Sequence, residues 1–422
     1  MPERSERNGY NYDRILTLLN DRYQKVLNLL KKLDYIERRY KFMINVENLY
    51  KIDQINNYIN QNLFEKHIYN ISTPTLFYSF PEYGEDEMYV KCYRDTYFLP
   101  QSHEYFTSYI SLFFEESVYS VEKCYRKEQN NTQIKALEFR QLCICLYDTS
   151  IQQGLTFIKK FLYELIRINL GGSINFTTIS YRKSIERYCD DAPDLRYGEY
   201  YLRKGKVSSE MYTYDMYIKK SDVENVEILN KMLEYQFVNI KYRNLQEEKD
   251  SNVPLEYNLI ISLFSKDPDI TYSIKLKFSK IRKLLINKEH DYEVVIINSI
   301  PVEYKNVVEH NIFSKIVKVD GSYVPENEFT KCDVVINGIE IASMGEKNNN
   351  KELLNNTLEL FEKSGKYSKS LFQLLRQHSK KWSSNISRTT MGIGYERLLQ
   401  VLLKEKCIQS VSFNRKDVFY DC

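Results

Sequence analysis

Apolar residues recur in helical steps along the first sixty residues of the chain. Between Tyr12 and Leu33 the steps alternate between four and three residues, which describes one stripe of a helix. The members of the stripe are Leu19, Tyr23, Val26, Leu30 and Leu33. A second helical pattern runs from about Val46 to Leu63, ahead of Pro74, which cannot continue a helix. We expect a helical N-terminal region, residues 1–60, that packs on its own domain or on a dimer partner.

The middle of the chain changes from a helical to a strand-like pattern. An apolar helix is predicted from about Ile151 to Asn169, and the pair Gly171 and Gly172 ends it as glycines commonly end helices. Between about residues 199 and 325 short strand-like runs stand among charged turns and helices. The runs are Leu259 to Phe264, Ile274 to Phe278 and Tyr292 to Asn298. We interpret this part as a small α+β insertion domain.

Composition narrows the class of protein. The chain has 422 residues, enough for a large core and one or two small domains. No apolar run approaches the ~20 residues of a membrane span, and the first residues lack the apolar core of a signal peptide, so we expect the cytoplasm and no membrane partner. The eight cysteines are scattered, which argues against a disulfide framework or a zinc site. A net charge of +3 is too small to indicate nucleic-acid binding by itself.

Four short segments follow one another in an order that identifies a family. They are Thr73-Pro74-Thr75-Leu76 with Pro81-Glu82-Tyr83-Gly84, then Leu99-Pro100-Gln101-Ser102, then Cys124-Tyr125-Arg126-Lys127-Glu128 with Leu137-Glu138-Phe139-Arg140-Gln141, and last Met391-Gly392-Ile393-Gly394-Tyr395-Glu396-Arg397-Leu398-Leu399. In this order they resemble motifs 1, 2 and 3 of class II aminoacyl-tRNA synthetases, in the aspartate, asparagine and lysine subgroup. Residues 180–198 also resemble the segment of bacterial aspartyl-tRNA synthetases that precedes their inserted domain.

The resemblance implies a fold and a division into domains. The fold is α+β, a class II synthetase-like antiparallel sheet flanked by helices, and the family forms homodimers through the motif 1 region. The two halves of the catalytic domain are 61–198, with motifs 1 and 2, and 326–422, with motif 3, and the insertion 199–325 separates them. Members of this subgroup carry an N-terminal anticodon-binding β-barrel of about a hundred residues, and a five-stranded barrel needs regular strand and turn alternation. Residues 1–60 are too few and too helical for one, so we expect no anticodon reading of the usual kind.

Activation of a carboxylate with ATP builds negative charge on phosphate oxygens, which guanidinium groups and Mg²⁺ stabilise. The resemblance gives Arg126 a catalytic role on the α-phosphate and the amino-acid carboxylate. It gives Arg397 a catalytic role in packing on adenine and reaching the γ-phosphate. It places Phe139 on the other side of the adenine and Glu128 near the amino edge. The remaining ATP-binding residues that it implies are Gly392 and Gly394.

Two carboxylates match the family's Mg²⁺ ligands. Asp333 and Glu340 lie seven residues apart around a predicted turn, and hard cations prefer such oxygen ligands. Alone, the two carboxylates would be weak evidence for a metal site. In the same way, a single Arg–Glu pair on a strand is more often a cross-strand ion pair than a pair of ligand-binding residues. Motif 3 around them strengthens the assignment.

The amino-acid pocket departs from the family at several positions. The implied pocket residues are Glu82, Gln101, Ser102, Glu104, Gln141, Cys143 and Lys347. Aspartyl enzymes hold the side-chain carboxylate of the substrate with a lysine and an arginine, where this chain has Thr107 and Lys347. They have a glutamine at the position of Glu104 and an aspartate at that of Cys143. An α-amino acid still fits, because Coulomb attraction to an ammonium group is less directional than a hydrogen bond. We therefore expect an aspartate- or asparagine-like substrate, with Lys347 as the side-chain reader.

Two further segments have an ordinary explanation. Cys143-Ile144-Cys145 suggests buried small side chains that shape a pocket more than redox or covalent chemistry. The range 363–388 holds seven Lys or Arg and no acid. It fits a solvated basic face, or a surface for an RNA acceptor stem or another polyanion.

Three functions remain open for the predicted adenylate. A specialised synthetase paralogue would pass it to the 3′ end of a tRNA. An amide-forming ligase, like the synthetase-like asparagine synthetase, would pass it to ammonia or to an amine on a metabolite or peptide. A non-catalytic regulatory paralogue would only bind nucleotide or tRNA, but it would have no need of the magnesium carboxylates Asp333 and Glu340. The sequence names neither the amino acid nor the acceptor.

Overall fold

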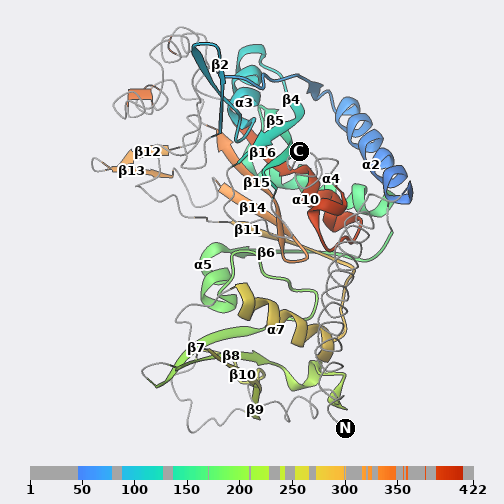
Figure 1. The fold of residues 1–422 in the computed structure, drawn as a ribbon, viewed down its shortest axis with the longest axis vertical. Helices are drawn as coiled ribbons and strands as arrows, with labels where there is room; N and C mark the ends of the chain where they lie inside the picture. Colours follow the sequence, from blue (N-terminus) through green and yellow to red (C-terminus); the bar gives the residue numbers. More distant parts are fainter. Residues whose placement is uncertain are drawn as a thin grey trace, which may run out of the picture.

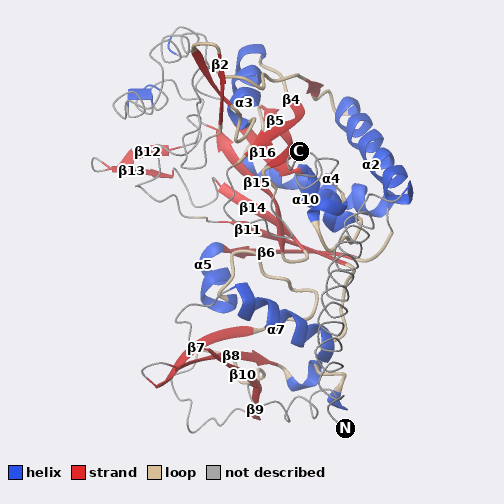
Figure 2. Cartoon of the chain, viewed as in Figure 1, coloured by secondary structure: helices blue, strands red, loops and turns tan. Residues whose placement is uncertain are grey.

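An eight-stranded mixed sheet forms the centre of the molecule (Figures 1 and 2). The computed structural model describes residues 46–77, 88–126, 136–169, 171–208, 211–227, 238–242, 252–265, 272–298, 316–319, 322–325, 331–347 and 386–411, with a few single residues between 300 and 376. In spatial order the strands are β1 (Tyr69–Asn70), β4 (Val118–Tyr125), β5 (Glu138–Tyr147), β16 (Arg388–Gly394), β15 (Ile339–Lys347), β14 (Lys331–Ile336), β11 (Tyr292–Asn298) and β6 (Ile174–Ser180). The pairs β1–β4 and β11–β6 are parallel and the others are antiparallel. This arrangement confirms the α+β fold class.

Helices α2 (Val46–Glu65), α4 (Ile151–Asn169) and α10 (Tyr395–Leu402) cover one face of this sheet (Figure 1). The apolar positions of α2 and α4 repeat in steps of three and four and are buried together with alternate residues of the central strands. The predicted end of α4 is confirmed, since Gly171 and Gly172 follow it with φ of +64° and +106°. The predicted helix around Val46 is also confirmed, whereas the stripe between residues 12 and 33 lies outside the described residues.

Close packing between α4 and the sheet depends on one glycine. A Cβ at Gly154 would lie 2.6 Å from Cγ2 of Thr389 on β16, closer than real Cβ contacts come. The helix therefore approaches the strand that carries the start of motif 3 without a side chain in between. Motif 3 itself continues from β16 directly into α10, as a strand followed by a helix.

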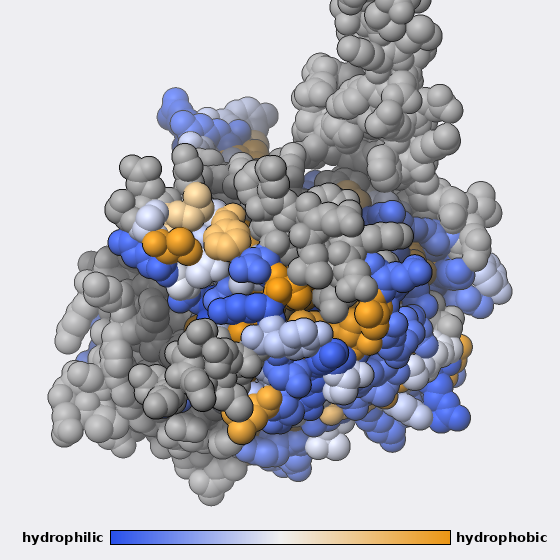
Figure 3. Space-filling view, turned by 90° about the horizontal axis from the view of Figure 1, so that it is seen from below, coloured by the Kyte–Doolittle hydropathy of each residue, from blue (hydrophilic) through white to orange (hydrophobic). Residues whose placement is uncertain are grey.

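The described part of the insertion folds as a second sheet that a helix packs against. Its strands lie in the order β7 (Tyr201–Ser208), β8 (Met211–Ile218), β10 (Leu259–Ser265) and β9 (Val238–Tyr242), and all the pairs are antiparallel. Helix α7 (Tyr272–Leu285) packs between this sheet and strands β6, β11 and β14 in a second core (Figure 1). Seen from the insertion end, the described surface is mostly hydrophilic and its hydrophobic residues form small separate groups (Figure 3).

Two predictions within residues 199–325 need correction. The run from Ile274 to Phe278 is part of α7 and not a strand, because Ile274, Phe278, Ile281 and Leu285 recur at helical spacing and are buried on one side. The strand at 292–298 has the predicted bounds, but as β11 it belongs to the main sheet and not to the insertion. Both of its faces are buried, since its alternate residues enter the two different cores.

Two small hairpins lie outside the two larger sheets. Strands β2 (Tyr89–Cys92) and β3 (Asp95–Phe98) form one, and β12 (Ile316–Val319) and β13 (Ser322–Pro325) form the other. After β3 the chain turns into α3 (Glu104–Phe114), which covers the face of β4, β5 and β16 opposite to α4. The space between the start of α3, the ends of the central strands and α10 is where the predicted site residues meet.

Candidate active site

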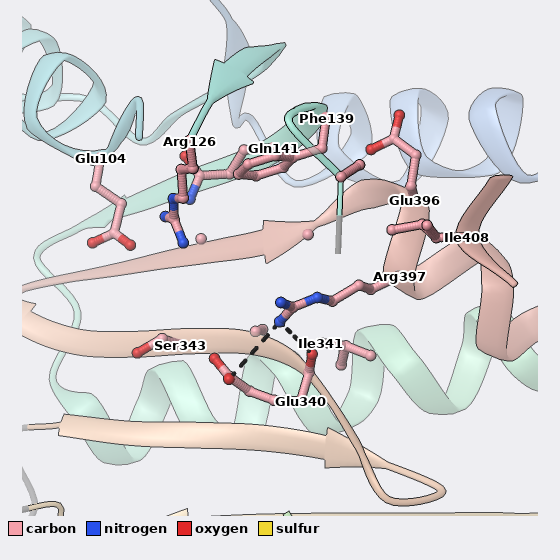
Figure 4. A pocket seen from close by; sticks show the side chains of 14 residues that line it. Glu104, Arg126, Phe139, Gln141, Glu340, Ile341, Ser343, Glu396, Arg397 and Ile408 are labelled. Carbon is pink, nitrogen blue, oxygen red and sulfur yellow. Dashed lines mark hydrogen bonds and ion pairs between the residues drawn. The ribbon is translucent and has the colours of Figure 1, made fainter. Parts of the chain in front are cut away.

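A cavity of roughly 150 Å³ opens on this face of the main sheet (Figure 4). Its lining comes from α3, the end of β4, strands β5, β15 and β16, and α10. Eight of the residues predicted from the sequence line it: Glu104, Arg126, Phe139, Gln141, Glu340, Gly392, Gly394 and Arg397. The structure thus brings motif 2, motif 3 and the segment after Gln101 together at one place.

The strand register places these side chains on a common face. Gly394 of β16 pairs with Gln141 of β5, and Gly392 pairs with Cys143 on one side and Ser343 on the other. Paired residues of antiparallel strands point to the same face, and residues two apart along a strand do so as well. The two glycines therefore leave the centre of this face without side chains, and the cavity lies above them.

Arg126 follows directly after β4 and is held by the loop before α3. Its Nε donates a hydrogen bond to the carbonyl oxygen of Gln101 at 3.0 Å, and its guanidinium carbon lies 5.3 Å from the centre of the Phe139 ring. In Figure 4 the side chains of Arg126 and Arg397 extend into the same space from different elements. Gln101 contributes its backbone to this arrangement, whereas the sequence predicted it as an amino-acid ligand.

Gln141 is oriented by three neighbours. Its Oε1 accepts hydrogen bonds from the Ser102 hydroxyl at 3.1 Å and from the His103 backbone N–H at 2.8 Å, and the Cys124 thiol lies 3.7 Å away. Because these donors fix the oxygen, the amide nitrogen points toward Gly392. Ser102 therefore positions Gln141 and is not itself part of the cavity lining.

A buried histidine that the sequence did not single out ties this loop to motif 1. His103 precedes α3, and its Nδ1 lies 2.7 Å from the Thr73 hydroxyl while its Nε2 lies 2.8 Å from the carbonyl oxygen of Lys123. Burial lowers the pKa of His103, against the opposing effects of the Lys123 carbonyl and Glu122. The neutral ring then donates from Nε2 and accepts at Nδ1. Thr73 of the predicted motif 1 thus supports the loop that carries the cavity residues.

Glu104 and Lys347 form an ion pair at the inner end of the cavity. The Lys347 Nζ lies 3.2 Å from Glu104 Oε2, and the lysine side chain is only 5% exposed. Lys347 does not line the cavity, although the sequence predicted that it reads the substrate side chain. Behind the pair lie Cys143 and Thr107, both buried, and burial together with the charge of Glu104 raises the pKa of the Cys143 thiol. Cys143 is therefore a buried thiol and not an exposed nucleophile.

Arg397 and Glu340, one of the two predicted metal carboxylates, lie at the other end of the cavity. Arg397 Nη1 donates to the Glu340 backbone carbonyl at 3.1 Å and lies 3.8 Å from Glu340 Oε2. Asp333 is not among the lining residues. Burial, followed by the negative charge of Glu340, raises the pKa of Asp333 to about 6, while Lys331 and the Ser343 hydroxyl act in the opposite direction. The two carboxylates are thus near enough to repel each other.

The glutamate of motif 3 has a structural role that the sequence did not assign. Glu396 is buried and accepts hydrogen bonds from the backbone N–H of Arg140 at 2.7 Å and from its Nε at 2.9 Å. The Arg140 guanidinium also lies over the ring of Tyr395, 4.5 Å from its centre. These contacts attach the start of α10 to β5 and so fix the position from which Arg397 extends. The Gly-x-Gly-x-Glu-Arg string contained the signal, because its Glu immediately precedes Arg397, the arginine that the sequence predicts as catalytic.

Two predicted residues, Glu82 and Glu128, lie outside the described residues, as does most of the basic range 363–388. Across the described part of the chain, no three His, Cys, Asp or Glu side chains are grouped to hold a metal ion by themselves. Asp333 and Glu340 can supply two ligands. Mg²⁺ bound to a nucleotide commonly takes one or two protein carboxylates and completes its shell with phosphate oxygens and water. The donor set therefore fits a magnesium ion that arrives with a nucleotide.

By its fold and its motifs this is a class II aminoacyl-tRNA synthetase-like catalytic domain. The family described as "tRNA synthetases class II (D, K and N)" matches residues 29–417, and the chain belongs to this family. Among described helices, none is both long and apolar enough to cross a membrane.

Individual relatives match over part of their length. The chain is 30% identical over 173 residues to an aspartate–tRNA(Asp/Asn) ligase of Thermoanaerobacter sp. (strain X514), covering 40% of this chain and 28% of that protein. It is 28% identical over 178 residues to an aspartate–tRNA ligase of Staphylococcus aureus (strain Newman), covering 41% and 29%. The chain thus aligns with less than a third of the length of each of these relatives.

A solved structure supports the fold. The Entamoeba histolytica asparaginyl-tRNA synthetase in complex with asparaginyl-adenylate superposes with a TM-score of 0.51 at 16% identity, covering 87% of this chain and 66% of that one.

Proposed function

We propose that this protein activates the carboxylate of an α-amino acid with ATP and forms an aminoacyl-adenylate. The observation that carries the proposal is the convergence of Arg126, Arg397, Phe139 and Glu340 on one cavity of the main sheet. Arg126 provides a planar cation for the α-phosphate and the amino-acid carboxylate. Phe139 and Arg397 offer an aromatic ring and a guanidinium between which an adenine can stack.

Mg²⁺ would neutralise the phosphates of the bound ATP. Asp333 and Glu340 would hold it, and the raised pKa of Asp333 supports this assignment because a divalent cation relieves the repulsion between two neighbouring carboxylates. The ion would supply electrostatic stabilisation of the charge on the phosphate oxygens. The protein groups orient the two substrates and exclude water from the reacting atoms.

The acceptor that we propose for the adenylate is the 3′ end of a tRNA. Membership in the family and the tRNA ligases among the relatives support it. We further propose that the protein is a specialised paralogue, because the pocket departs from the aspartyl pattern at Glu104, Thr107, Cys143 and Lys347. The expected amino acid is aspartate- or asparagine-like.

We also propose a homodimer through the motif 1 region. Strand β1 is at the edge of the main sheet, and large apolar side chains are exposed on it and on α2. Tyr50, Phe64 and Tyr69 are 64%, 77% and 51% exposed. A second copy of the chain would cover these side chains and the open edge of the sheet.

The test is ATP–pyrophosphate exchange with each proteinogenic amino acid, with and without total tRNA. Exchange should require Mg²⁺ and should fall roughly 100- to 1000-fold in Arg126→Ala and in Arg397→Ala, because each loses a charged contact that strengthens in the transition state. Arg182→Ala is the matched control, since this arginine pairs with Glu186 and is 84% exposed. Near-normal exchange in both cavity variants would contradict the proposed site. Transfer of a labelled amino acid to tRNA tests the acceptor.

A further inference from the structure

Helix α2 is hydrogen-bonded to both ends of α10, which lies on the same face of the main sheet (Figure 1). The Tyr395 hydroxyl, on the first residue of α10, donates to Asn56 Oδ1. At the other end, shortly after α10 stops at Leu402, Asn48 Nδ2 donates to Glu405 Oε1 at 2.7 Å. Because the earlier residue of α2 bonds to the later end of α10, the two helices run along each other in opposite directions.

Apolar packing holds these two helices in one core but does not fix their register. Burial of apolar surface has no preferred direction, so it tolerates a small slide or rotation of one helix against the other. A hydrogen bond depends on distance and angle and does not tolerate such a shift. The hydrogen bonds at the two ends of α10 therefore select one register. The apolar members of this contact are Ile52, Ile55, Ile59 and Leu63 of α2 and Leu398, Leu399 and Leu402 of α10.

The same side of α2 is also attached to the strand that leads to Arg126. The Tyr119 hydroxyl of β4 donates to Asn60 Oδ1 at 3.0 Å, and β4 ends at Tyr125, directly before Arg126. Asn56 and Asn60 are four residues apart, so they are neighbours on one side of the helix. One helix thus sets the place of α10 relative to β4.

Tyr395 transmits the position of α2 to Arg397, which follows two residues later. The tyrosine is buried, and the Arg140 guanidinium carbon lies 4.5 Å from the centre of its ring. Burial raises the pKa of Tyr395 to about 12, with Arg140 opposing this shift and Glu396 adding to it. The hydroxyl is therefore protonated at neutral pH and donates to Asn56. A shift of Tyr395 at the start of the helix would carry Arg397 with it.

We propose that Asn56 is a positioning residue: through the Tyr395 hydroxyl it fixes the register of α10 and so aims Arg397 at the bound nucleotide. Asn56 does not line the cavity, whereas Arg397 does and extends into it from α10 (Figure 4). The asparagine acts through the helix and touches neither substrate. The inference rests on the proposed use of ATP and extends the machinery for it to α2, a helix that contributes no residue to the cavity lining.

The affinity for ATP in the presence of Mg²⁺, measured by titration calorimetry, tests this role without depending on catalysis. Asn56→Ala and Tyr395→Phe remove the same hydrogen bond. Each should weaken ATP binding roughly fivefold, because Arg397 is then aimed at the nucleotide in only a fraction of the molecules. Asn56→Asp keeps an acceptor oxygen for the hydroxyl and should restore the native affinity. Asn57→Ala is the matched control, since this exposed neighbour donates to Asp53 of the same helix at 3.3 Å.

Arg397→Ala distinguishes positioning from a general weakening of the fold. If Asn56 acts through Arg397, Asn56→Ala should cause no further loss of ATP affinity once the arginine has been removed. A merely structural role would add its own loss in this background. In pyrophosphate exchange, Asn56→Ala should raise the KM for ATP and leave the KM for the amino acid unchanged.

Native-like ATP affinity in both Asn56→Ala and Tyr395→Phe would overturn the inference and leave the proposed adenylation standing. So would additive losses in the Arg397→Ala background, or an equal loss in Asn57→Ala. If Asn56→Ala does not fold, Tyr395→Phe decides the question, because it keeps the ring beside Arg140. The expected losses of ATP affinity in a protein without pyrophosphate exchange would support the inference and contradict the proposed catalysis. A native protein that does not bind ATP would contradict both.

Discussion

Replacing Asp333 by asparagine should stabilise the ligand-free protein at neutral pH. The pKa of this carboxyl group is raised from 3.8 to about 6, first by burial and then by the charge of Glu340. A folded-state pKa above the unfolded one adds stability that is complete below pH ~4 and is lost as the pH rises through about 6. The difference between the two pKa values corresponds to about 3 kcal/mol, which is an upper estimate of the loss at pH 8.

Urea unfolding at pH 4 and at pH 8 measures this effect. Asp333→Asn keeps an oxygen that can accept from the Ser343 hydroxyl but carries no charge, so the unfolding free energy of the variant should exceed that of the native protein by up to about 3 kcal/mol at pH 8. The two proteins should converge at pH 4. Asp53→Asn, at an exposed aspartate on α2, is the control. A variant that is less stable at pH 8, or a difference that does not change with pH, would refute the reasoning.

Three further changes have defined outcomes. Gly392→Ala places a Cβ 2.5 and 2.6 Å from polar side-chain atoms of the cavity, so pyrophosphate exchange should fall roughly 100-fold with the melting temperature little changed. Glu340→Gln should raise the Mg²⁺ concentration for half-maximal exchange about tenfold, because an amide binds a hard cation less well; an unchanged Mg²⁺ titration would move the metal elsewhere. Arg282→Met removes a buried guanidinium that donates to three backbone carbonyls in 194–198, which should lower the unfolding free energy in urea by roughly 2–4 kcal/mol, whereas the exposed Lys280→Met should not.

Elements with a clear period were predictable from the sequence, whereas the sheet that a strand buried on both faces joins was not. Helix α4 has the predicted bounds because one face is apolar and the other polar, and β10 was found from its short apolar run. The five-residue window at 274–278 was too short to reveal the helical spacing that continues to Leu285. Strand β11 is apolar without interruption from Val294 to Ile297, because these residues lie between two cores, so its pattern contains no information on which sheet it joins.

Part of the site was predictable because short motifs carry it. Arg126, Phe139 and Arg397 meet as the family resemblance implied. The sequence did not predict the ion pair between Glu104 and Lys347. The two residues are 243 positions apart, and in the sequence each is only a separate departure from the aspartyl-tRNA synthetase pattern. Buried supports such as His103 have no motif of their own. Their importance comes from hydrogen bonds to distant backbone, which only the folded chain brings together.

The parallel pairing of β6 with β11 determines how the insertion could have been acquired or removed. The end of one strand and the start of its parallel neighbour lie at opposite ends of the pair, so the chain between them must run back along the full length of the strands and cannot be a tight hairpin. Everything from Tyr181 to Asp291, including the second sheet and α7, occupies this connection. Trimming the insertion to a short turn would therefore force β11 out of the main sheet. A shortened protein would need a crossover of about a dozen residues or more in its place, and an evolutionary ancestor without the second sheet would have needed one as well.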